Sequence, residues 1–282
     1  MKKAKFVIDS TVYIEDEYIK KYDCEVVQLN VIEGDKTYKE FDLTPEETYA
    51  KQDAGAGLTT SQPAPTEFTE AYTKSFEKGA EIVYVFTLSK SLSGTYQSAI
   101  IARNDDERKD DIHVFDTGNA AYGNAMLFLE AMKVRESVDS EEAFVKGVQK
   151  IIDGSDLLFN VENLFSLQKG GRLSKSQALI GTAMRIKPMI VMEDGKLALG
   201  DKTRTYGKLT EKMIERIKKN GDPKKTLVAR LINVNSKEQY ELMKSKLEEV
   251  FPNIEYTETE FLGPVFRVHV GKKGFGVSWY YR

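Results

Sequence analysis

The sequence predicts an α/β fold, in which a mostly parallel sheet flanked by helices precedes an α+β part with a largely antiparallel sheet. Strand and helix patterns alternate through the first 155 residues, which is typical of a parallel sheet covered on both faces. Hairpins and short strands follow in the remainder. Because the pattern changes near Ser155, we expect one domain over residues 1–155 and another over residues 156–282.

Composition limits the classes of protein to which this chain could belong. Its hydrophobic fraction of 41% and charged fraction of 30% are those of a folded protein, and its net charge of −3 does not favour nucleic acid. The single cysteine, Cys24, excludes an internal disulfide framework. The chain has no apolar run of the ~18 residues that a membrane span needs. Its first ten residues lack the apolar core of a signal peptide. We therefore expect a cytoplasmic protein with no stable membrane insertion.

The first half alternates short apolar strands with helices. A helix begins at Thr44, where Thr-Pro-Glu-Glu provides an N-cap, a proline at the first position and a capping box, and it ends at Gly55. A polar loop over residues 58–68 follows, and then a helix through Phe76. We predict strands over residues 5–8, 24–32, 81–86 and 112–115, and further helices over residues 96–102, 120–134 and 142–152.

Several of these strands end in small polar residues. The groups are Asp9-Ser10-Thr11, then Thr87 with Ser91 and Ser93, and finally Asp116-Thr117. Ligands of open α/β sheets collect at the carboxyl ends of strands, so we predict one shared site. The loop over residues 87–95 leads into a helix N-terminus, which favours an anion. A hydroxyl-rich helix cap is the alternative for this loop.

The second half contains elements of both kinds. The pattern Arg185–Met192, Asp194-Gly195, Lys196–Leu199 predicts a hairpin. Ser174 caps a predicted helix that carries Leu179, Ile180, Ala183 and Met184. Residues 164–171 form a predicted helical turn. Helices are predicted over residues 206–219 and 236–251, the latter with a capping box of Ser236 and Gln239, and strands over residues 157–161, 226–234, 254–259, 265–270 and 275–281.

Sequence signatures of common catalytic sites are absent: there is no nucleophile elbow, no P-loop, no dinucleotide fingerprint and no zinc-protease motif. His113 lies inside a predicted strand, which favours a structural role. His269 is placed late in a predicted strand, from which it could project into a cleft. The default interpretation of residues 271–276 is a β-turn.

Arginine with hydroxyl side chains describes a site for an acid better than a hydrolase. Arg172 and Arg204 each follow a turn signal, and the guanidinium fork suits a carboxylate or phosphate, although surface charge is the alternative. An apolar cavity could be lined by side chains of the second half, with ordinary domain core as the alternative: Ile180, Met184, Ile186 and Met189.

Taken together, the motifs resemble the DegV family, bacterial proteins that bind long-chain fatty acids. The resemblance covers nearly the whole chain. It is carried by Asp-Ser-Thr at 9–11, Thr-Ser-Gln-Pro at 60–63, Leu-Ser-Gly-Thr-Tyr-Gln-Ser at 92–98, Lys-Gly-Gly-Arg-Leu-Ser at 169–174, Ile-Gly at 180–181, Ile-Lys-Pro at 186–188, Asp-Gly at 194–195, Arg204, and Gly-Pro-Val at 263–265 before His269.

The resemblance implies a fatty acid held between two domains, with no cofactor and no catalytic residue in this chain. The implied head-group residues are Thr60, Ser61, Ser93, Gly94, Arg172, Arg204 and His269. It also implies a partner, a dihydroxyacetone-kinase-like fatty acid kinase, which transfers a phosphoryl group from ATP to the carboxylate and so feeds phospholipid synthesis. The chain departs from the family around His269, where Arg267, Val268 and Val270 stand and residues 271–273 read Gly-Lys-Lys.

Two alternatives remain open from the residues. One is a serine ester hydrolase that uses Ser93 with His269. The other is the substrate subunit of a kinase acting on a small polyol, which predicts a small polar cavity rather than a long apolar one.

Overall fold

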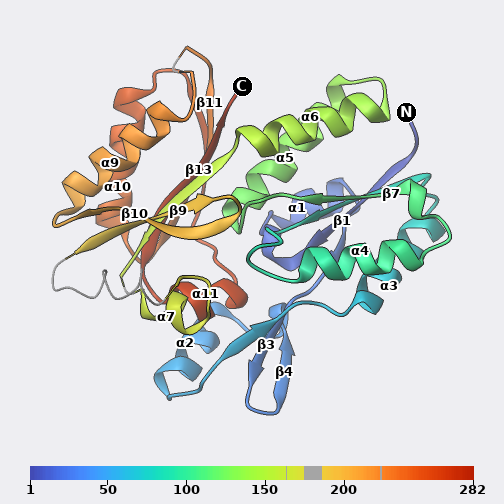
Figure 1. The fold of residues 1–282 in the computed structure, drawn as a ribbon, viewed down its shortest axis with the longest axis horizontal. Helices are drawn as coiled ribbons and strands as arrows, with labels where there is room; N and C mark the ends of the chain where they lie inside the picture. Colours follow the sequence, from blue (N-terminus) through green and yellow to red (C-terminus); the bar gives the residue numbers. More distant parts are fainter. Residues whose placement is uncertain (163, 175–185, 223) are drawn as a thin grey trace.

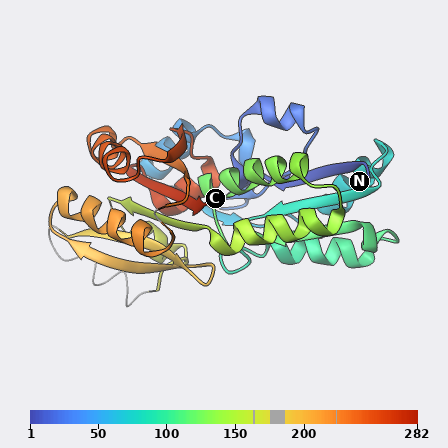
Figure 2. The same ribbon diagram turned by 90° about the horizontal axis from the view of Figure 1, so that it is seen from above.

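The computed structural model describes residues 1–162, 164–174, 186–222 and 224–282, which form two large sheets and a small one. The two large sheets lie side by side along the molecule, with the small sheet, α2, α7 and α11 beside their junction (Figure 1, Figure 2). Within the described residues, no helix has both the length and the apolar character required to span a membrane.

The first sheet is wholly parallel, with strand order β2-β1-β6-β7. Alternate side chains face opposite layers of helices, as the period of a strand requires. Val7, Val83 and Val85 pack against α3 and α4, whereas Phe6 and Tyr84 face α5 and α6. The bounds are β1 Ala4–Asp9, β2 Glu25–Val27, β6 Ile82–Thr87, β7 Ile112–Asp116, α3 Pro65–Glu77, α4 Thr95–Asp105, α5 Tyr122–Ser137 and α6 Glu141–Gly154.

The second sheet has the order β10-β9-β8-β13-β11-β12 and is antiparallel except for the pair β11 and β12. One face packs on α9 and α10 through Leu158, Met213 and Leu247. The other face, with Leu157 and Ile232, turns toward the first half of the chain. The bounds are β8 Asp156–Val161, β9 Lys187–Glu193, β10 Lys196–Thr203, β11 Leu227–Val234, β12 Ile254–Thr259, β13 Gly274–Tyr281, α9 Tyr206–Lys219 and α10 Lys237–Val250.

The small sheet and a group of short helices link the two large sheets. Helix α11 packs against α2, α7 and the small sheet, so a segment from the end of the chain lies among segments from its beginning (Figure 1). The bounds are β3 Asn30–Glu33, β4 Lys36–Lys39, β5 Thr59–Ser61, α1 Asp16–Lys21, α2 Pro45–Asp53, α7 Phe165–Lys169 and α11 Pro264–Val270, with 3-10 turns η1 Ser10–Val12, η2 Glu40–Asp42 and η3 Lys109–Asp111.

The predicted fold class is confirmed, but several elements differ from their prediction. Residues 265–270, predicted as a strand, form α11. Their alternating valines suggest a strand, yet Gly263 as N-cap and Pro264 at the first position begin a helix, and packing of Val265 and Val268 on one side overrides strand propensity. His269 is therefore presented by a helix and not by a strand.

Smaller corrections concern caps and loops. The single strand predicted over residues 24–32 is two strands in different sheets, β2 and β3, and the predicted loop over 58–68 contains β5. The side chain of Ser236 makes no capping bond; instead its N–H donates to Asn233 Oδ1 at 2.9 Å. The helix predicted after Ser174 lies outside the described residues.

Candidate functional site

A cavity lies where the second sheet faces residues of the first half of the chain. It has about 1000 Å³ of empty space, its open mouth included. Its walls are mostly aliphatic and aromatic. The polar side chains of the lining are those of Thr60, Ser61, Gln62, Ser93, Asn160, Arg172, His269 and Lys273. The apolar lining includes Leu29, Leu88, Leu92, Tyr122, Leu157, Phe159, Val161, Leu167, Ile232, Val234, Leu262, Val265, Phe266 and Phe275.

Thr60, from the first half of the chain, and His269, from the second, lie next to each other at this cavity. Strand β5 pairs with β3 and so fixes Thr60 opposite Val31, while α11 presents His269. The hydroxyl of Thr60 is hydrogen-bonded to His269 Nε2 at 2.8 Å. The neighbouring Ser61 hydroxyl accepts a bond from Asn30 at 3.1 Å. The bond between Thr60 and His269 therefore joins the two halves of the chain at the cavity.

His269 is neutral at physiological pH. Burial, with a contribution from the positive charge of Arg172, lowers the pKa of His269 to about 4. Within the described residues, its Nδ1 has no hydrogen-bond partner. A Cβ at Gly170 would lie 2.2 Å from Nδ1, so glycine at that position makes room for the imidazole. The ring is thus held between Gly170 and Thr60.

Arg172 brings a positive charge to the same region. Gly171, with φ +74°, turns the chain after α7 so that the Arg172 N–H donates to Leu167 at 2.9 Å. The guanidinium donates to the carbonyl oxygens of Gly170 at 2.6 Å and Leu92 at 3.2 Å. Among the described ion pairs none involves Arg172. A half-buried cation held by neutral oxygens is suited to an anionic ligand.

Ser93 and Gly94 lie at the N-terminus of α4. The Ser93 hydroxyl is 2.9 Å from that of Thr95 and accepts the Thr95 N–H at 3.3 Å. Gly94 is the N-cap of α4, and a Cβ there would lie 2.5 Å from the side chain of Gln62, which lines the cavity. The strand, loop and helix N-terminus predicted for this segment are all present.

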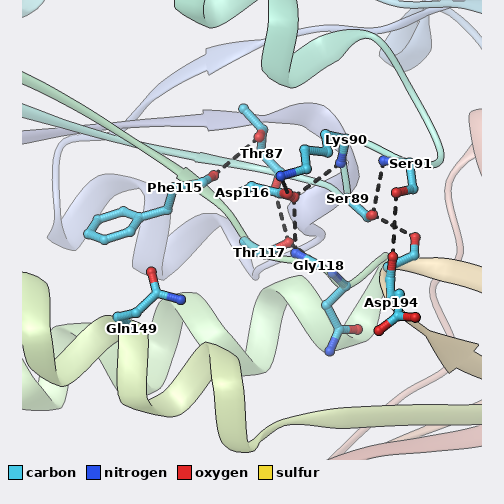
Figure 3. Close-up of polar contacts among 12 residues, drawn as sticks. Thr87, Ser89, Lys90, Ser91, Phe115, Asp116, Thr117, Gly118, Gln149 and Asp194 are labelled. Carbon is cyan, nitrogen blue, oxygen red and sulfur yellow. Dashed lines mark hydrogen bonds and ion pairs between the residues drawn. The ribbon is translucent and has the colours of Figure 1, made fainter.

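Ser89 and Ser91 of this loop contact the second half of the chain, whereas Asp116 holds the loop from within the first half (Figure 3). Ser89 donates to the carbonyl of Gly195 at 2.6 Å, and Ser91 donates to that of Asp194 at 3.5 Å, both in the β9–β10 turn. Asp116 accepts the N–H groups of Lys90 and Gly118, each at 3.1 Å. These contacts are structural.

The polar strand ends therefore do not share one cavity, contrary to the prediction. Asp9 and Ser10 line a second cavity, with about 870 Å³ of empty space including its open mouth, together with Tyr13, Phe41 and Phe261. Burial raises the pKa of Asp9 to about 6. Within the described residues, no group of acidic, histidine or cysteine side chains is arranged to hold a metal ion.

Other residues proposed for the site lie elsewhere. Arg204 is exposed and outside the cavity lining. Met189 is buried in the core beneath α9, and Ile186 is half-buried outside the lining. Ile180 and Met184 lie outside the described residues. Their roles stay predictions.

Sequence reasoning missed the glycines at the start of β13. Gly274 lines the cavity, and a Cβ at Gly276 would lie 2.4 Å from the Tyr122 hydroxyl. Glycines at 274 and 276 thus allow β13 to approach Asn160 and Tyr122 closely, where a side chain would have no room. The Gly-Phe-Gly pattern at 274–276, read as part of a turn, was the available signal.

These features define a class: an α/β protein of two large sheets and a small one, with an apolar cavity and a cationic, hydroxyl-lined region. Residues 3–282 match the sequence profile of the DegV family. A DegV domain-containing protein of Listeria innocua is 34% identical over 284 residues, 98% of each chain. The chain belongs to the DegV family.

Solved structures agree with this assignment. A fatty-acid-binding DegV family protein from Thermus thermophilus is 28% identical, with a TM-score of 0.89 over 100% of both chains. A stearic-acid-binding protein from Eubacterium ventriosum is 26% identical, with a TM-score of 0.86 over 99% of this chain and 98% of that one.

Proposed function

We propose that this protein binds a long-chain fatty acid in the apolar cavity, with the carboxylate near Thr60, Ser93, Arg172 and His269. The observation that carries the proposal is an apolar cavity whose polar region holds Arg172 without a described acidic partner. We place the cavity between domains of residues 1–155 and 156–282, and the protein in the cytoplasm. The fatty-acid-binding relatives support the same ligand class.

The energetics favour such a ligand. Burying each methylene contributes about 0.8 kcal/mol, so ~14 methylenes contribute a gross ~11 kcal/mol before the cost of association. A carboxylate buried without partners would oppose binding strongly. Arg172 and the hydroxyls of Thr60 and Ser93 would offset that penalty. Tight binding should therefore require both the acyl chain and the carboxylate of the ligand.

We further propose that the bound acid is presented to a separate ATP-dependent kinase. A carboxylate oxygen would attack the γ-phosphorus of ATP, the bond from that phosphorus to ADP would break, and an acyl phosphate would form. The resemblance supports this role, as does the lack of nucleotide-binding motifs in the chain. The hydrolase alternative is not favoured, because His269 bonds Thr60 while Ser93 pairs with Thr95. The apolar lining disfavours a polyol.

Calorimetric titration of the delipidated protein tests the binding proposal. Octadecanoate should bind tightly, its methyl ester at least about tenfold more weakly, and glycerol not at all, because only the carboxylate forms an ion pair with Arg172. Arg172→Gln should reduce the affinity for octadecanoate, whereas Arg108→Gln, which changes an exposed arginine outside the cavity lining, should not. Equal affinity for ester and acid, or binding of glycerol alone, would contradict the proposal.

A further inference from the structure

Glu40 is a fully buried acid that is not itself among the residues lining the cavity. Its Oε1 accepts bonds from the Tyr13 hydroxyl at 2.5 Å and from the Val265 N–H at 3.2 Å, and its Oε2 accepts from the Ser10 hydroxyl. Burial raises the pKa of Glu40 to about 7 despite these donors. A buried acid of this kind disfavours folding unless its hydrogen bonds are formed.

The Val265 bond places Glu40 at the start of α11. The first N–H groups of a helix have no partner within it, and Pro264 has none to donate. The N-cap, Gly263, has no side chain to cap the helix. Glu40, 225 positions earlier in the chain, supplies the acceptor instead. A Cβ at Gly263 would lie 2.6 Å from Glu40 Oε1, so glycine permits the approach.

The other end of α11 carries His269, one helical turn beyond Val265. Residues four apart lie on the same side of a helix, and both side chains line the cavity. A helix of 7 residues is not stable by itself and takes its position from the contacts at its ends. At its far end, Tyr49 donates to the carbonyl of Gly271 at 3.2 Å.

We propose that Glu40 is a positioning residue for the head-group site: by holding the N-terminus of α11 against Ser10 and Tyr13, it sets the place of the His269 imidazole beside Thr60. Glu40 touches no ligand in this arrangement and acts through α11. The role of His269 in binding a fatty acid rests on the proposed function. The dependence of the His269 position on Glu40 does not.

The test uses the ligand-free protein labelled with 15N-histidine, whose only two imidazoles belong to His113 and His269. In Glu40→Ala, the imidazole signals of His269 should shift, and its titration midpoint should rise by at least about one pH unit toward the ordinary ~6.5. His113, in β7, should not change. Ser140→Ala, which removes the α6 cap bond to Ala143, is the control for lost stability.

Glu40→Gln covers the case in which the alanine variant does not fold. Glutamine keeps the volume and a single oxygen acceptor, so it should move the His269 signals in the same direction by a smaller amount. Unchanged His269 signals in the folded Glu40 variants, or an equal change in Ser140→Ala, would overturn the proposal. Octadecanoate affinity, measured separately, should fall at least about tenfold in Glu40→Ala; a wild-type protein that binds no fatty acid would overturn the proposed function alone.

Discussion

The Thr60 hydroxyl and His269 Nε2 lie 2.8 Å apart, although 209 positions separate the two residues in the chain. The bond joins a strand of the small sheet to α11. It places a hydroxyl and a neutral imidazole beside the half-buried Arg172, which is the feature of the cavity most suited to an acid.

Replacing Thr60 with valine should weaken fatty acid binding while preserving the shape of the site. Valine removes the hydroxyl and leaves His269 Nε2 without this partner, a loss of about 1–3 kcal/mol, or roughly fivefold to 150-fold in affinity. Thr59→Val is the matched control, because Thr59 is exposed on the same strand. Calorimetry with octadecanoate measures both variants, and equal affinities would count against a role for Thr60.

Gly170→Ala should displace His269. The backbone at Gly170, with φ −73°, accepts alanine, but the added Cβ would lie 2.2 Å from His269 Nδ1, so the ring must move. We expect a loss of about 1–3 kcal/mol in stability and weaker binding of the acid. Gly154→Ala, at the end of α6, meets nothing within 4 Å and should leave binding unchanged. If Gly170→Ala binds like the wild type, the imidazole has no role in binding.

Two serines of one loop should behave differently. Ser89→Ala removes the bond to Gly195 that links the loop to the β9–β10 turn, so it should lower the free energy of unfolding by about 1 kcal/mol without changing fatty acid affinity. Ser93→Ala should do the reverse, reducing affinity with little change in stability, because Ser93 lines the cavity. Urea denaturation and calorimetry on both variants check this, and the opposite pattern would refute the division of roles.

His269 should make stability depend on pH. Its pKa is about 4 in the folded protein and about 6.5 in the unfolded chain, so the unfolded chain binds more protons between these values. Stability therefore falls as pH is lowered through this window. His269→Gln lacks this contribution, and the stability of the wild type relative to the variant should drop by up to about 3 kcal/mol between pH 7 and pH 4. Urea denaturation at several pH values measures it; a constant difference would contradict the lowered pKa.

The first half of the fold could be predicted well because its signals are local. The run of residues 81–86 has strand character throughout, and Thr44 begins α2 with the capping box expected of it. The division at residue 155 stays a prediction.

Prediction failed where contacts distant in the chain decide the structure. Residues 265–270 alternate like a strand, but Pro264 begins a helix and packing against α2 and α7 supports it. Likewise, no local pattern distinguishes Ser93, which faces the cavity, from Ser89, which holds a turn more than a hundred residues away. The capping role of Glu40 depends on the position of Val265 and could not be read from either segment.

Identification of the bound molecule tests the central claim most directly. The protein purified from bacteria would be denatured and extracted with organic solvent, and the extract examined by mass spectrometry for small acids. We expect one long-chain fatty acid per protein molecule. The identity of that fatty acid would give the preferred length and unsaturation of the ligand. An extract without fatty acid, both as purified and after incubation with added fatty acids, would contradict the account.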